Sequence, residues 1–217
     1  NYRAMGERVK MATNNIEKYD YAQKRLLNSA NTSFRSLAEA QELFIATSDN
    51  LRGGYGYSLE QALDITDSMS FAFVRNATAA DKARSAINAF DKALSQEKVS
   101  VDEWRTLNSA IPTLAKNIGD AIGKTSQEIN RMGNSSQLTA VMLNEGFLFS
   151  LKENKEAADS MANTVGDAFT KLNNECVSCH SDFTDGTFDH KITGLQLDEM
   201  HVDFDCGDCH AENNFSK

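Results

Sequence analysis

Residues 99–133 read VSVDEWRTLNSAIPTLAKNIGDAIGKTSQEINRMG, and this stretch decides the fold. It contains two capping boxes, Ser100 with Glu103 and Thr125 with Glu128. In a capping box the hydroxyl accepts a hydrogen bond from the amide of the third residue, whose carboxylate reaches back to the capping residue. Each box marks the start of a helix, and the two starts are only 25 residues apart. The stretch therefore predicts several short helices in succession.

The same signals extend toward the N-terminus. Ser36 with Glu39 and Ser58 with Gln61 form two more capping boxes. Apolar residues recur at helical spacing, in the sets Phe34, Leu37, Ala38, Ala40, Phe44, Ala46 and Ala83, Ile87, Phe90, Leu94. Expected helix breaks lie between them, at Gly53, Gly54, Gly56, Gly123 and Gly133, and Pro112 suits the first turn of a helix. We predict an all-α domain of six to eight short helices.

This helical portion carries few groups that could do chemistry. It contains no His and no Cys. Its acidic residues look dispersed along solvated faces, as in KENKEAAD, where Glu153 and Glu156 alternate with Lys152 and Lys155. Since catalytic assemblies need a recognisable base or nucleophile, we predict a structural role for this portion, and not an enzyme.

Charge and metal-binding residues are concentrated at the C-terminus. All four Cys and all four His lie in the last 42 residues, and residues 174–217 carry a net charge of −8. The rest of the chain carries −1, by difference from the total of −9. Such a break predicts two domains, residues 1–173 and residues 174–217. The acidic segment argues against a nucleic-acid partner, and no apolar run is long enough to span a membrane.

The order of motifs in the helical portion resembles a known family. SLEQALDITDSMSFA, the stretch quoted above and LNEGFLFSLKENKEAADSMANTVGDAFTKLNN look like the tape-measure domain of long-tailed phages and prophages, from about residue 8 to residue 174. The resemblance implies a structural protein that lies inside the tail tube, sets tail length during assembly and contacts tail tube proteins. It implies no catalytic residues, and it places the protein in the host cytoplasm and then the virion tail.

The C-terminal segment contains two C-x-x-C-H pentads, the attachment signature of haem c. The first is Cys176, Cys179 and His180, and the second is Cys206, Cys209 and His210. Two haems with proximal His180 and His210 need two distal ligands, and the two remaining histidines are His190 and His201. Two alternatives stay open: the four Cys bind one structural Zn²⁺, or they form two disulfides.

The sequence FDHKITGLQLDEMHVDFDCGDCH resembles a recurring segment of multihaem cytochromes c. By this similarity His190 and His201 ligate the haem irons, giving two bis-His c-type haems in a small, irregular segment that the haems organise. The resemblance implies electron transfer with a redox protein, and the acidic charge favours a basic partner. Because haem c is attached after export, this prediction places the protein in the periplasm or outside the cell.

The two resemblances predict different functions for one chain. Our first prediction is electron transfer by two haems carried on the helical domain. The alternative is a tail tape-measure protein whose Cys/His segment binds zinc or has no function. A natural mosaic and a joining of two unrelated sequences would both explain the combination, and homo-oligomer formation stays open.

Overall fold

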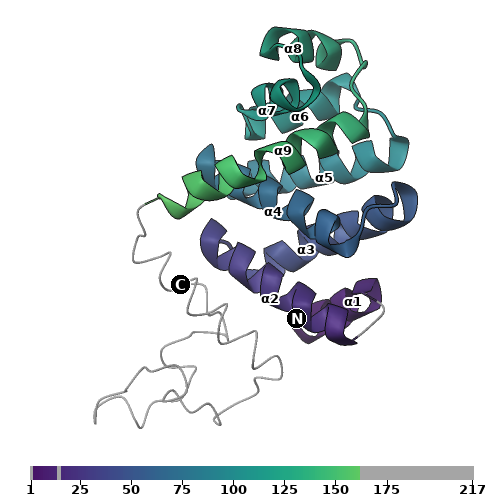
Figure 1. Cartoon of the computed structure of the whole chain (residues 1–217), viewed down its shortest axis with the longest axis vertical. Coiled ribbons are helices and arrows are strands. Elements are labelled where there is room, and N and C mark those ends of the chain that lie inside the picture. The colour runs from purple at the N-terminus through teal and green to yellow at the C-terminus, as the bar shows by residue number, and fades with distance from the viewer. Residues whose placement is uncertain (1, 14–15, 162–217) are drawn as a thin grey trace.

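The computed structural model describes residues 2–13 and 16–161, and these residues fold into α-helices (Figure 1). The helices are α1 (Tyr2–Thr13), α2 (Ile16–Ser33), α3 (Leu37–Asp49), α4 (Leu59–Arg75), α5 (Ala80–Gln96), α6 (Val101–Ala110), α7 (Leu114–Ile122), α8 (Ser126–Asn134) and α9 (Ala140–Asp159). A π-helical turn, η1 (Asn50–Gly54), continues α3. The all-α prediction is therefore confirmed.

The helices are stacked in order along the long axis of the body. Figure 1 shows α1, α2 and α3 at one end and α6, α7 and α8 at the other, with α4, α5 and α9 between them. The last helix, α9, returns to the middle and packs against both α4 and α7. Its Phe147 ring meets the Phe90 ring of α5 edge to face, with centroids 5.4 Å apart. One continuous apolar core joins both ends of the body.

All four predicted capping boxes are present. At the start of α6, the Ser100 amide donates to Glu103 Oε2 at 2.8 Å and the Glu103 amide donates back to Ser100 Oγ at 3.3 Å. A capping box satisfies amides that would otherwise lack a partner at a helix start, and a lost cap costs about 1 kcal/mol. These local contacts fix where four of the helices begin.

The predicted number of six to eight helices is too low, because the described residues alone contain nine. Several helix ends carry no glycine or proline. The chain reverses instead at Phe34, Ala77, Glu97 and Ser136, which all adopt positive φ angles between 49° and 59°. Left-handed backbone costs a non-glycine residue roughly 1–2 kcal/mol. Local backbone hydrogen bonds close these turns: after α4 the Ala77 amide donates to the Val74 carbonyl at 2.9 Å and the Thr78 amide donates to the Phe73 carbonyl at 2.9 Å. Because the left-handed position is not a glycine, the sequence gives no sign of the turn.

Two of the predicted breaking positions act differently. Pro112 lies before α7 and not in its first turn. It occupies the second position of a turn in which the Leu114 amide donates to the Ile111 carbonyl at 2.9 Å. Gly133 lies inside α8. A larger side chain would not fit at this position, because the Trp104 ring of α6 packs directly on the Gly133 Cα.

We predict that Gly133→Ala destabilises the domain by about 2 kcal/mol, because the new Cβ would overlap the Trp104 ring. Gly53→Ala is the matched control. Its Cβ would meet nothing within 4 Å and its φ angle is not positive, so we expect it to raise the free energy of unfolding by roughly 0.5–1 kcal/mol. Urea unfolding followed by circular dichroism measures both, and equal effects of the two substitutions would contradict the close α6–α8 packing.

Candidate functional site

The residues predicted to bind haem lie outside the described part of the chain. They are Cys176, Cys179, His180, His190, His201, Cys206, Cys209 and His210. The predicted domain boundary at residue 173 lies outside it too, so both stay predictions. Within residues 2–13 and 16–161, no three His, Cys, Asp or Glu side chains are grouped closely enough to hold a metal ion. None of the described helices has the length and apolar character needed to cross a membrane.

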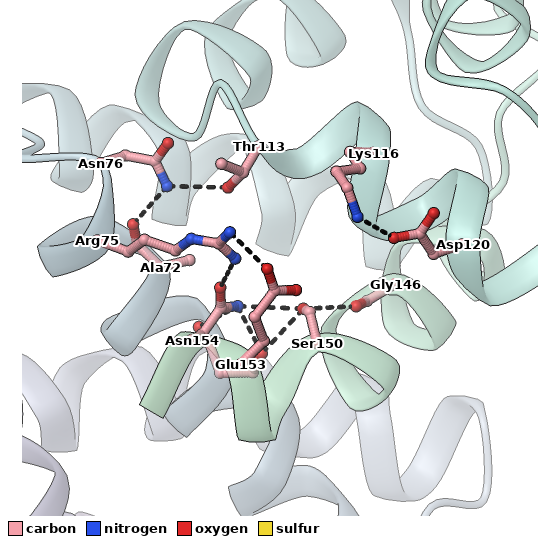
Figure 2. A network of polar contacts seen from close by, with 11 residues as sticks. Ala72, Arg75, Asn76, Thr113, Lys116, Asp120, Gly146, Ser150, Glu153 and Asn154 are labelled. Atoms are coloured by element: carbon pink, nitrogen blue, oxygen red, sulfur yellow. Dashed lines mark hydrogen bonds and ion pairs between the residues drawn. The ribbon is translucent and has the colours of Figure 1, made fainter. Parts of the chain in front are cut away.

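The most developed polar site in the described residues is a buried seam between α4 and α9 (Figure 2). The side-chain amide nitrogen of Asn154, Nδ2, donates to Ser150 Oγ at 3.1 Å and to Ser68 Oγ at 3.2 Å. Ser150 Oγ in turn donates to the Gly146 carbonyl at 2.7 Å. Because Ser68, Ser150 and Asn154 are all buried, these hydrogen bonds satisfy groups that would be costly to leave unpaired.

Arg75, the last residue of α4, closes this seam at one end. Its Nη1 donates to Asn154 Oδ1 at 3.1 Å, and its Nη2 pairs with Glu153 Oε1 at 2.6 Å. The next residue, Asn76, donates to Thr113 Oγ1 at 3.0 Å at the start of α7. Figure 2 shows these side chains converging from the three helices. Glu153 is exposed, as expected of an acid on a solvated face, and its carboxylate also pairs with the guanidinium of Arg75 from α4.

A second polar cluster joins α2 to α4. Arg25 Nη2 lies 2.7 Å from Asp64 Oδ1 and 2.6 Å from Asp67 Oδ2. Asp64 is partly exposed, but Asp67 is buried. Burial raises the pKa of Asp67 to about 6, against the opposing effect of the Arg25 charge. Asp67 is therefore mostly ionised and paired with Arg25 at pH 7.

Both clusters hold helices together, and neither brings a nucleophile to a base. Sequence reasoning missed them because their members are far apart in the chain. One signal was available: Gly146, Ser150 and Asn154 recur every fourth residue and form a small, polar stripe along one helix face. Such a stripe indicates the close approach of another helix. It could not identify Ser68 and Arg75 as the partners.

We predict that Asp67→Asn removes a pH dependence of stability. The folded-state pKa of about 6 lies above the ordinary value of 3.8. The folded state therefore binds a proton more tightly, and its stability falls as the pH rises from 4 through 6. The Asp67→Asn variant lacks this loss. Between pH 4 and pH 7, the free energy of unfolding of the native chain should therefore fall by about 2–3 kcal/mol relative to that of the variant.

Urea unfolding at a series of pH values measures this difference. Asp64→Asn is the control, since it removes the more exposed partner of the same Arg25 and leaves the buried carboxyl in place. A constant difference between Asp67→Asn and the native chain from pH 4 to pH 7 would show that burial does not perturb Asp67.

Comparison with known proteins gives one finding. The tape measure protein family model matches residues 1–185, which include the whole described helical body and the first C-x-x-C-H pentad. The second pentad, His190 and His201 lie beyond the matched residues. No curated protein and no solved structure matches the chain. The match covers most of the chain and agrees with the resemblance of the helical motifs, and the chain therefore belongs to the tape measure protein family.

Proposed function

We propose that this chain acts as a structural component of a phage or prophage tail. The observation that carries the proposal is the family match over residues 1–185, within which all the described helices lie. The protein would be made in the host cytoplasm and incorporated into the virion tail, where its partners are tail tube proteins. The family match favours this function over electron transfer.

The construction of the helical body suits a structural role. Its helices have local capping contacts at their starts, and the α4–α9 seam ties two of the longer ones together through buried hydrogen bonds. Satisfied buried polar contacts give a defined arrangement of helices, because any shift would leave donors and acceptors unpaired. We infer that the body enters the tail as a preformed unit.

We predict that disrupting this body prevents tail assembly. Phe147→Asp places a carboxylate in the buried core beside Phe90, which should unfold the domain. Electron microscopy of particles from a producing strain should then show no tails of normal length. Glu156→Ala, at an exposed position of the same helix, is the control and should leave the tails normal.

Mass spectrometry of purified tails from the native strain adds an independent measurement. Peptides from residues 16–161 should be present in them. Tails that lack these peptides, or normal tails in the Phe147→Asp strain, would exclude the structural tail function.

A second candidate function is electron transfer by two c-type haems. It rests on the two pentads and on the two further histidines between them, which together supply four thiols and four imidazoles for two irons. In this arrangement Cys176, Cys179, Cys206 and Cys209 would bond the porphyrins. The axial ligands would be His180, His190, His201 and His210. Bis-His ligation closes both axial positions, which favours electron transfer over substrate turnover.

Intact mass measurement separates the cofactor alternatives. After expression with the haem c maturation machinery, the haem hypothesis predicts a mass increase of two haems and a reducible haem spectrum that survives acid-acetone extraction. Cys206→Ser with Cys209→Ser should remove one haem and leave the other. A colourless protein with one Zn²⁺ per chain, or with neither metal nor haem, would exclude electron transfer and leave the tail function intact.

A further inference from the structure

The outward face of α9 exposes two large apolar side chains among charged ones. Phe149 is 60% exposed and Val141 is 45% exposed, and both are among the few large hydrophobic side chains that the described surface exposes. Met142 and Leu148, which flank this face, are half-buried and pack in part against the core. Exposed apolar side chains gathered on one face are typical of an interaction surface.

Helix geometry separates this face from the one that packs on the body. One side of the helix carries residues that follow one another at spacings of one to four: Val141, Glu145, Leu148, Phe149 and Lys152. The buried residues of α9 lie on the opposite side, and they include Leu143, Phe147, Ser150 and Asn154. In Figure 1, α9 lies on the viewer's side of α4 and α5.

Two charges on the outward face, Glu145 and Lys152, form a self-complementary pattern. The other exposed acids of α9 have cationic partners on the same chain: Glu153 pairs with Arg75, Glu156 with Lys152 and Asp159 with Lys155. Glu145 and Lys152 lie at equal distances along the helix from the midpoint between Leu148 and Phe149. Glu145 has no ion-pair partner among the described residues, and Lys152 has one weak surface contact, 3.8 Å from Glu156. When two α9 helices lie antiparallel about a two-fold axis at that midpoint, Glu145 of each copy lies beside Lys152 of the other. A parallel pair would place like charges together.

We propose that the outward face of α9 binds a second copy of this chain in an antiparallel homodimer. Leu148 and Phe149 form the apolar centre, and two Glu145–Lys152 pairs flank it. This inference concerns the described residues alone and does not depend on the proposed tail function. One helix-on-helix contact is small for a protein interface, so we expect a dissociation constant in the micromolar range.

Sedimentation equilibrium of the full chain, under reducing conditions that prevent disulfide association, tests the proposal. The native chain should form dimers as its concentration rises from about 1 to 300 μM, a range that brackets a micromolar dissociation constant. Phe149→Glu should be monomeric throughout. Met11→Glu changes a comparably exposed apolar side chain on α1 and should dimerise like the native chain.

A charge exchange tests the antiparallel arrangement. Glu145→Lys alone and Lys152→Glu alone each bring like charges together at two symmetric positions and should weaken dimerisation by about three- to tenfold. The variant with both substitutions restores opposite charges and should recover most of the native affinity. Circular dichroism checks that each variant remains folded.

Three results would overturn the proposal. A native chain that stays monomeric to about 300 μM shows that the face binds no second copy, whether it is free or covered by another part of the chain. Dimers that survive Phe149→Glu form through another surface. A double charge variant weaker than either single one excludes the antiparallel register.

Discussion

The fold depends on how closely α9 approaches its neighbours. On the α4 side, Ser68, Ser150 and Asn154 take the place of large apolar side chains and join the helices through buried hydrogen bonds. On the α7 side Gly146 is essential for close packing, because a Cβ there would lie 2.7 Å from Ile118 Cγ1. Since α9 is the last described helix and lies in the middle of the body, it joins α4 to α7, which lies toward one end of the stack.

How well each feature could be predicted from sequence depends on how far apart the interacting residues lie along the chain. The capping boxes join residues three apart, so Ser100 with Glu103 could be recognised in the sequence and was confirmed. The left-handed turn at Ala77 closes through backbone hydrogen bonds and has no glycine to mark it, and the Arg75–Glu153 pair joins residues 78 apart in the chain. Neither leaves a local pattern. The fold class was therefore predictable, but the number of helices and the polar seam between α4 and α9 were not.

The Cys/His segment predicts a specific cofactor, whereas the family match rests mainly on the helical body. The ligand count in residues 174–217 suits two haems, yet the tape measure family match runs to residue 185 and takes in Cys176, Cys179 and His180. The family model matches most of the chain, and the described part of the chain is a packed helical body. Both observations favour the tail function over electron transfer. Under the proposed tail function, a cofactor would add chemistry to that body without changing its structural role.

Native-state hydrogen exchange measured by mass spectrometry tests most directly whether α9 and its seam organise the body. If they do, the amides of α4 and α9 exchange only by global unfolding and are the best protected in the domain. The helices at the two ends of the stack, α1 and α8, exchange earlier through partial opening. The account is contradicted if α9 amides exchange with a lower opening free energy than those of α1 or α8.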